Sequence, residues 1–188
     1  MRCFIAIDID EKLKKAIADL QRQLAAKADL RKSDVKWVEP QAMHLTLKFL
    51  GEVEDERIVE VCNIVKNAAA ASKSFELDIE SVGYFGGGSA RILWVGTGRG
   101  SENLCRLQED IEQQLSAAGW PKENRSFAGH LTLCRVKNPK AGLKLAQMSE
   151  DYKDVNLGTI SADSVTVYQS LLKPTGPVYI VLGNYELQ

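Results

Sequence analysis

The tetrapeptide His-Leu-Thr-Leu occurs twice in this chain of 188 residues, at 44–47 and 130–133, and it contains both histidines of the sequence. Side chains of an extended strand point alternately to opposite faces. Each histidine therefore shares a face with the threonine two positions later, Thr46 or Thr132. One such strand is ordinarily structural, but two identical copies favour a fold that brings both polar pairs to one site.

The leucines of the repeated strand point away from the histidine. By the same alternation we expect Leu45, Leu47 and Phe49, and likewise Leu131 and Leu133, to enter an apolar core. The polar pair then remains accessible on the other face. Each strand would anchor itself through one face and present two reactive groups on the other.

The two halves of the chain align at the offset of the histidines, 130 − 44 = 86. The alignment predicts a strand at 2–8 and a helix from about residue 11, repeated as a strand at 91–96 and a helix that Ser101 caps and Gly119 ends. A clear helix follows the first histidine strand around 58–65, and a short or weak one at 142–149 follows the second. Extended segments are expected at 75–85, 155–170 and 178–187.

These elements predict an α+β fold with mostly antiparallel sheets. The glycine-rich segment 86–89 and the Pro174-Thr175-Gly176-Pro177 segment are typical of hairpin turns. We expect one bilobal domain over residues 1–188, duplicated at approximately 1–90 and 91–188. Each lobe would be a small sheet backed by helices, with the histidine strands facing each other across a central groove.

The net charge of −1, from 24 basic and 25 acidic residues, argues against a protein that binds an extended nucleic acid through global electrostatics. A nucleic-acid substrate would be held locally. The candidates for a basic rim near the histidine strands are Lys48, Arg91, Arg125 and Arg135.

The four cysteines are scattered singly, without metal-ligand or disulfide spacing. They indicate a reducing compartment, and the cytoplasm is expected. The apolar run at 3–7 is too short for a secretory signal, and no segment has the apolar length of a membrane span. Cys134 shares the parity of His130, so we place it in the wall of the site but not in the chemistry.

Several familiar sites do not fit the sequence. The glycines of 96–100 lack the spacing of a dinucleotide or phosphate loop, two histidines alone do not make a zinc site, and no Gly-x-Ser-x-Gly is present. The remaining chemistry is acid–base catalysis by two imidazoles, with no metal and no cofactor. Two histidines with two hydroxyl donors suit attack on a phosphodiester, and a strained cyclic phosphate especially.

The sequence closely resembles the 2H phosphoesterase superfamily, and within it the RNA 2′,3′-cyclic phosphodiesterases, also called the 2′-5′ RNA ligase family. The resemblance rests on Trp-Val-Glu-Pro at 37–40, the run 44–53 and His-Leu-Thr-Leu-Cys-Arg at 130–135. Segments 2–8, 91–96 and 168–170 extend it over nearly the whole chain. It implies opening of a 2′,3′-cyclic phosphate at an RNA end to a 2′-phosphomonoester.

Carried over to this chain, the resemblance implies that His44 is the general acid and His130 the general base. Thr46 and Thr132 would hold the phosphate, and Arg135 would contact phosphate or stack on the terminal base. The partners expected are RNA ends or small cyclic-phosphate nucleotides, with no membrane, and the chain is expected to be a monomer.

One residue departs from the family pattern, because Gly129 stands where proline usually precedes the second histidine. Glycine frees the backbone, so we expect a looser approach to this strand. Three alternatives stay open: 2′-5′ RNA ligation, cleavage of 2′-5′ oligonucleotides or small cyclic nucleotides, and an RNA-end binding module without turnover. The candidates for base stacking are Trp37, Tyr84, Phe85 and Phe127, with Trp37 favoured as a core residue.

Overall fold

The computed structural model describes residues 1–174 and 176–188. Their strands are β1 (Arg2–Ile7), β2 (Val35–Trp37), β3 (Leu45–Glu52), β4 (Phe75–Phe85), β5 (Ile92–Thr97), β6 (His130–Val136), β7 (Asn156–Ala162), β8 (Ser164–Lys173) and β9 (Gly176–Glu186). The helices are α1 (Glu11–Lys27), α2 (Ile58–Ala71), α3 (Ser101–Ala117) and α4 (Pro139–Ser149), with 3₁₀ turns η1 (Pro40–Ala42), η2 (Asp55–Arg57) and η3 (Glu150–Tyr152).

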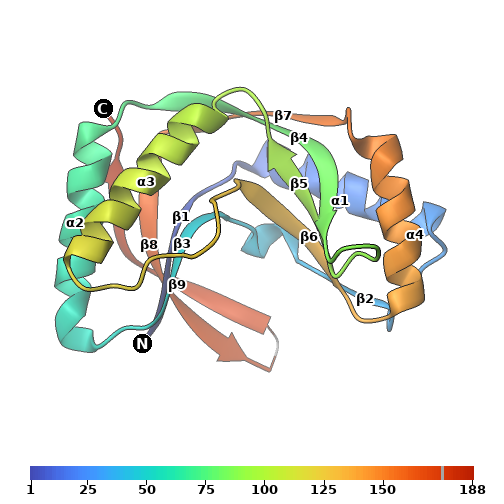
Figure 1. The fold of residues 1–188 in the computed structure, drawn as a ribbon, viewed down its shortest axis with the longest axis horizontal. Helices are drawn as coiled ribbons and strands as arrows, with labels where there is room; N and C mark the ends of the chain where they lie inside the picture. The colour runs from blue at the N-terminus through green and yellow to red at the C-terminus, as the bar shows by residue number, and fades with distance from the viewer. Residues whose placement is uncertain (175) are drawn as a thin grey trace.

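The strands form two antiparallel sheets. The first has the order β3-β1-β8-β9 and the second the order β2-β6-β5-β4-β7. Helices α2 and α3 lie on the side of the first sheet, and α1 and α4 on the side of the second (Figure 1). The α+β fold with two sheets backed by helices, predicted from the sequence, is confirmed.

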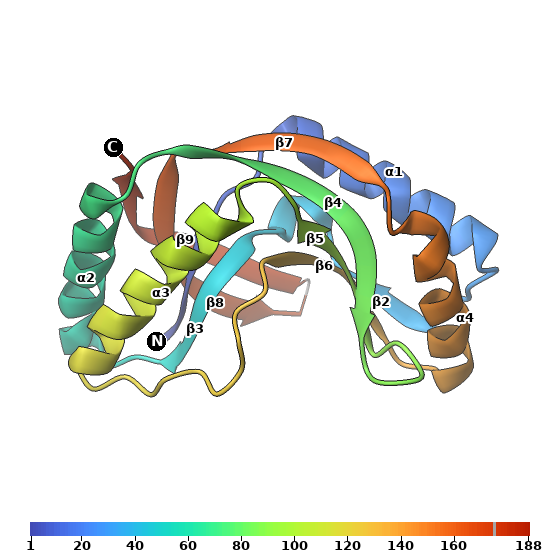
Figure 2. The ribbon, with the colours of Figure 1, turned by 45° about the horizontal axis from the view of Figure 1, so that its top comes forward.

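The two sheets exchange elements between the halves of the chain. Strand β4 belongs to the first half but pairs with β5 and β7 in the second sheet, whereas β8 from the second half pairs with β1 in the first sheet. Figure 2 shows β4 as a long curved strand that runs from the α2 side to the far end of the second sheet. Because each sheet needs strands from both halves, neither half can complete its sheet alone.

The predicted helix near residue 11 is confirmed as α1. Its amide at Leu13 donates to the Asp10 carboxylate (2.7 Å), which caps the helix, and Ile17, Leu20 and Leu24 are buried as their spacing predicts.

The start of α3 differs from its prediction, because Gly100 occupies the N-cap and Ser101 is already helical. Gly100 has a φ of 91°, and a Cβ there would lie 2.1 Å from the carbonyl oxygen of Glu76, so the site accepts only glycine. The predicted stop at Gly119 is confirmed by its φ of 92°, the left-handed conformation typical after a helix end.

The helix α4 begins earlier than predicted, at Pro139, because Asn138 caps it by accepting from the amide of Lys140 (2.9 Å). Asparagine followed by proline is a start signal for a helix. Both predicted hairpins are confirmed by the pairing of β4 with β5 and of β8 with β9. Thr175, in the second turn, lies outside the described residues.

A β-bulge changes the faces of β3 beyond Leu47. Thr46 pairs with Ala6 but Lys48 pairs with the next residue, Ile5, so one extra residue is inserted on β3. Lys48 therefore turns into the core at 4% exposure, and Phe49 turns out at 65% exposure. The prediction that Phe49 enters the core is wrong because strict alternation does not continue through a bulge.

The second histidine strand has the same bulge. Thr132 pairs with Trp94 and Cys134 with the adjacent Leu93, so Cys134 turns inward and is completely buried. The prediction that Cys134 lies in the wall of the site is wrong. Burial raises the pKa of its thiol to about 12. The bulge brings Arg135 to the face of Thr132, the position that corresponds to Phe49 on β3.

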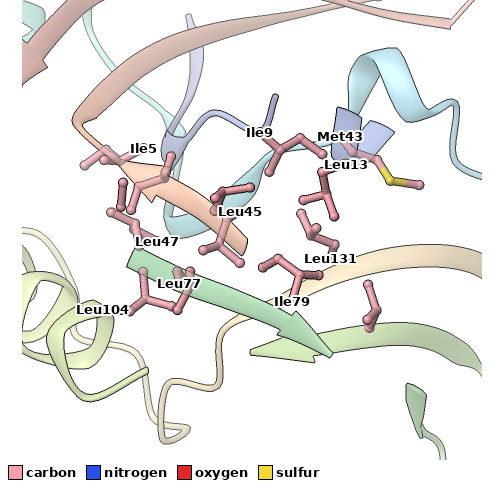
Figure 3. Close-up of a cluster of buried hydrophobic side chains, with 14 of the residues drawn as sticks. Ile5, Ile9, Leu13, Met43, Leu45, Leu47, Leu77, Ile79, Leu104 and Leu131 are labelled. Atoms are coloured by element: carbon pink, nitrogen blue, oxygen red, sulfur yellow. The ribbon is translucent and has the colours of Figure 1, made fainter. Parts of the chain in front are cut away.

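The two histidine strands rest on one shared core. The leucine between histidine and threonine, Leu45 on β3 and Leu131 on β6, packs in the same cluster with Ile5 and Ile79 (Figure 3). Burying one such side chain contributes roughly 2–3 kcal/mol. The core therefore fixes both strands from behind, as the sequence predicts for these leucines, and β3 and β6 contact each other where the sheets meet.

Candidate active site

His44 lies directly before β3, after the turn η1, and its side chain is 13% exposed. Its ring packs against Phe4, Tyr168 and Tyr179, with ring centroids 5.9, 4.6 and 5.1 Å away. Its Nε2 lies 3.4 Å from Oδ1 of Asp8, the residue that follows β1. The imidazole thus packs against three aromatic rings, and one of its edges lies beside a carboxylate.

Asp8 is itself held by hydroxyl donors from β8. The phenol of Tyr168 donates to Oδ1 (2.5 Å) and the hydroxyl of Thr166 donates to Oδ2 (3.1 Å), while the Asn184 amide donates to Thr166 (2.7 Å). Burial, with the adjacent Asp8 carboxylate second, raises the pKa of Tyr168 far above its ordinary range. Tyr168 therefore stays protonated and orients the carboxylate toward His44.

Opposing effects act on the pKa of His44. Burial lowers it and dominates, because it penalises the charged imidazolium, whereas Asp8 and a hydrogen bond to the backbone carbonyl of Ala42 raise it. The net direction is below the ordinary value. Asp8 therefore preserves part of the protonated form that burial would otherwise remove.

His130 opens β6 and is positioned by a backbone carbonyl and by aromatic rings. Its Nδ1 lies 2.8 Å from the carbonyl oxygen of Ala128, and Phe85 and Trp94 lie at centroid distances of 5.1 and 6.2 Å. A carbonyl only accepts hydrogen bonds, so Nδ1 carries the proton and Nε2 of the neutral ring keeps a free lone pair. That lone pair can accept a proton.

The two histidines have similar positions relative to their strands but different side-chain partners. The His130 ring is hydrogen-bonded to the carbonyl of Ala128, two positions earlier, and the backbone carbonyl of Ala42, two positions before His44, raises the pKa of His44. Within the described part of the chain, only His44 of the two has a carboxylate partner, Asp8. The two histidines therefore occupy corresponding positions at the start of their strands but differ in their electrostatic surroundings.

Thr46 and Thr132 lie on the faces that carry the histidines. Thr46 pairs with Ala6, which lies on the same face of β1 as Phe4. Thr132 pairs with Trp94, which contacts His130. Both threonines are partly exposed. The predicted sharing of a face by histidine and threonine is therefore seen on both strands.

The basic residues predicted for the rim divide into two groups. Arg91, Arg125 and Arg135 are exposed. Lys48 is buried, where its ammonium donates to Glu112 (2.8 Å) and to the carbonyl of Pro121 (2.9 Å). The prediction that Lys48 contributes to a basic rim is wrong, because the β3 bulge turns it into the core.

Of the aromatic residues predicted to stack on a base, Phe85 is 41% exposed beside His130. Trp37, as favoured, and also Tyr84 and Phe127 pack partly buried against the main core. Sequence reasoning missed the set beside His44, namely Phe4, Tyr168 and Tyr179. It also missed Asp8, whose only signal is that it ends the apolar strand at 2–7.

Gly129 is tightly packed rather than left-handed. A Cβ at this position would lie 2.5 Å from Cδ2 of Leu104 and 3.1 Å from Oγ1 of Thr97. The glycine therefore provides space for Leu104 of α3. Whether the backbone before His130 is looser than with proline stays a prediction.

Two possible features are not found among the described residues. No three side chains of His, Cys, Asp or Glu gather where they could hold a metal ion. Nor is any described helix long and apolar enough to cross a membrane.

Residues 7–94 and 95–179 each match the family described as LigT like Phosphoesterase. A Methanocaldococcus jannaschii protein named RNA 2′,3′-cyclic phosphodiesterase is 36% identical over 98% of this chain and 100% of its own length. A Thermotoga maritima protein with the same name is 35% identical over 100% of this chain and 95% of its own.

Solved structures have the same fold. A Thermus thermophilus protein superposes with a TM-score of 0.79 at 27% identity, covering 100% of this chain and 98% of its own. E. coli LigT complexed with 3′-AMP gives a TM-score of 0.77 at 24% identity, covering 99% and 97%. At that identity the second likeness shows the fold alone.

Proposed function

The chain belongs to the LigT-like phosphoesterase family, and from that membership we propose that it is an RNA 2′,3′-cyclic phosphodiesterase. It opens the cyclic phosphate at an RNA 3′ end and leaves a 2′-phosphomonoester. The full-length relatives that carry this activity in their names support the reaction, and the two histidine strands support the site.

The proposed step is a single in-line displacement at phosphorus. Nε2 of His130 takes a proton from water as the water oxygen bonds to phosphorus, and the bond from phosphorus to O3′ breaks. His44 gives its proton to O3′, and the phosphate stays on O2′. Neutral His130 and protonated His44 are the starting states that this exchange needs.

The observation that carries this assignment is the carboxylate at one histidine. Asp8 lies 3.4 Å from His44 and opposes the larger lowering of its pKa by burial, so it stabilises the charged, proton-donating form relative to the same site without a carboxylate. The Nδ1 bond of His130 to a carbonyl leaves a lone pair that can accept. The reversed assignment would place the base beside an anion and leave the acid without one. The different environments of the two histidines support this acid–base order.

Thr46 and Thr132 are the proposed donors to the non-bridging phosphate oxygens, where negative charge grows in the transition state. Arg135, exposed on the face of Thr132, adds a positive charge to the same region. The reaction proposed needs neither a metal nor a cofactor, because the imidazoles move both protons and the hydroxyls and guanidinium bind the anion.

We also propose that the domain arose by duplication near residue 90 and that the protein is a cytoplasmic monomer. The equivalent strand orders β3-β1-β8-β9 and β6-β5-β4-β7 support the duplication, as do two family matches that meet at 94 and 95. The cysteines, all free, support a reducing compartment. Size-exclusion chromatography with light scattering tests the monomer.

The reaction is tested with a short RNA that ends in a 2′,3′-cyclic phosphate. The expected product has a 2′-phosphate, and His44→Ala or His130→Ala should each lower kcat/KM at least about 100-fold, the low end for loss of a positioned acid or base. Circular dichroism and thermal unfolding verify that each variant is folded. Chelation with EDTA should change nothing.

Contrary outcomes contradict the proposal in different ways. A 3′-phosphate product would reverse the acid and base, and unchanged turnover in either alanine variant would remove that histidine from the mechanism. Binding without turnover would make the protein an RNA-end binding module. Joining of RNA ends would favour a 2′-5′ RNA ligase, and cleavage of 2′-5′ oligonucleotides with no action on the cyclic end would favour a 2′-5′ phosphodiesterase.

A further inference from the structure

A pocket of about 330 Å³ lies between β3 and the segment that connects α3 to β6. Phe49 of β3 forms one wall, and Trp120, Lys122 and Arg125 of the connecting segment are among the residues of the other. The roles proposed for the two histidines, the threonines and Arg135 do not use this pocket.

Both walls of the pocket belong to chain segments that are close in sequence to a histidine of the candidate active site. Phe49 is five residues after His44, and Arg125 is five residues before His130. The Phe49 ring lies 6.2 Å from that of Phe4, which lies 5.9 Å from the ring of His44. Phe49 is three positions after Thr46 on the strand, a distance of about 10 Å at most. The pocket therefore continues the site on the side of His44.

The connecting segment is fixed by polar contacts to β3 and α3. The Lys48 ammonium donates to Glu112 of α3 and to the carbonyl of Pro121, and the Glu123 amide donates to the same carboxylate oxygen of Glu112 (2.8 Å). These contacts tie β3, α3 and the connecting segment together beneath the pocket. The pocket therefore has a fixed floor.

A cation–π contact fixes the far wall. The guanidinium of Arg57 stands 3.6 Å from the centre of the Trp120 ring and donates to the carbonyl of Ala118 (2.8 Å). Trp120 is 8% exposed, whereas the Phe49 ring opposite is 65% exposed. One wall is thus packed and rigid, and the other offers a free aromatic face.

We propose that this pocket binds the nucleotide on the 5′ side of the cyclic end. The inference rests on the proposed function. If His44 protonates O3′, the terminal ribose lies on the side of His44, and the RNA leaves that ribose through its 5′ carbon. The pocket is the hollow that continues the site on this side, so the RNA chain enters it.

The chemistry of the walls matches a nucleotide. An exposed phenylalanine ring is a stacking platform for any base. Lys122 and Arg125 supply positive charge to the linking phosphate, and the one acidic lining residue, Glu123, has its backbone tied to Glu112. An aromatic platform and cations, with Asn124 the one amide side chain of the lining, predict binding of single-stranded RNA with little sequence preference.

The test compares two substrates that differ only in the upstream chain, a nucleoside 2′,3′-cyclic phosphate and a trinucleotide with the same cyclic end. The wild type should prefer the trinucleotide. Phe49→Ala should lower kcat/KM for the trinucleotide roughly 5- to 150-fold, the measured range for one base stack, and leave the mononucleotide unchanged. Phe49→Tyr should retain the preference because it keeps the ring.

Matched controls separate the pocket from general surface effects. Val59→Ala removes another exposed apolar side chain, on α2, and should change neither rate. Arg125→Ala should weaken trinucleotide use and reduce its salt dependence, whereas Arg22→Ala on α1 should not. An equal loss on both substrates in Phe49→Ala, or no loss on either, would overturn the proposal.

Failure of the proposed function has a different signature. If the wild type hydrolyses neither substrate, the proposed function is wrong. Fluorescence anisotropy with a labelled trinucleotide bearing a 2′-phosphate then still tests whether the pocket binds the upstream nucleotide. Weaker binding by Phe49→Ala than by wild type supports the upstream site. Equal affinity of the two proteins overturns it.

Discussion

Replacing Lys48 by methionine should destabilise the protein strongly, although the change removes only one of the 24 basic residues of the chain. The Lys48 side chain is 3% exposed, and it forms an ion pair with Glu112, which is 14% exposed. Methionine keeps the length and apolar character of the stem. The change therefore isolates the ammonium group and its two hydrogen bonds.

The size of the effect follows from what remains after the substitution. The Glu112 carboxylate, 14% exposed, would lose its cationic partner, and its Oε2 already has no hydrogen-bond partner among the described residues. The carbonyl of Pro121 would also lose its donor. Breaking a buried pair on one side typically costs about 3–5 kcal/mol. For a domain of this size that corresponds to a fall in Tm of roughly 6–20 °C.

The measurement is a pair of unfolding curves, thermal and in urea, for the wild type, Lys48→Met, Glu112→Leu and the double variant. The double variant should recover most of the loss, because replacing both partners by apolar groups is often neutral. Lys27→Met is the matched control. Lys27 pairs with Asp151 at the same 2.8 Å but is 51% exposed, so its loss should cost less than about 1 kcal/mol.

Two results would refute this reasoning. If Lys48→Met lowers the free energy of unfolding no more than Lys27→Met does, the pair of Lys48 and Glu112 does not stabilise the fold as argued. If the double variant is as unstable as the sum of the single variants, the ammonium and the carboxylate act independently. Either result would also remove the argument for a fixed floor beneath the pocket at Phe49.

Three further predictions concern the site and its surroundings. Asp8→Asn should lower the pKa of His44 further, since Asp8 raises it; ring NMR titration resolves the signal of His44 because the chain has two histidines. Gly83→Ala should destabilise the protein by about 1–3 kcal/mol and slow turnover, because its Cβ would lie 2.3 Å from the Trp94 ring that contacts the second histidine; unfolding and rate measurements check it. Cys134 should resist thiol reagents in the native state and react after denaturation, because burial raises its pKa to about 12.

The repeated motif allowed the arrangement of the two histidine–threonine pairs to be predicted from sequence. His44 and Thr46 fall on one face because a strand alternates, and Leu45 falls on the other for the same reason. These relations are local. They hold wherever the strand is placed, so they could be predicted before the fold was known.

Beyond the threonine, local reasoning fails on both strands. The bulges insert one residue opposite β1 and β5, so Lys48 and Cys134 turn inward while Phe49 and Arg135 turn outward. A bulge is a property of the pairing between two strands. Alternation within one strand could not locate it.

The partner of His44 also depends on the tertiary structure. Asp8 lies 36 positions before His44, and the groups that orient it, Thr166 and Tyr168, come from the other end of the chain. These residues meet only because β1 lies between β3 and β8. The sequence by itself determined that two histidine–threonine pairs lie on the opposite strand face from buried leucines, because side-chain alternation is local. The tertiary structure decided which histidine has a carboxylate and which side chains surround the pair, because strand order and register join residues from distant parts of the chain.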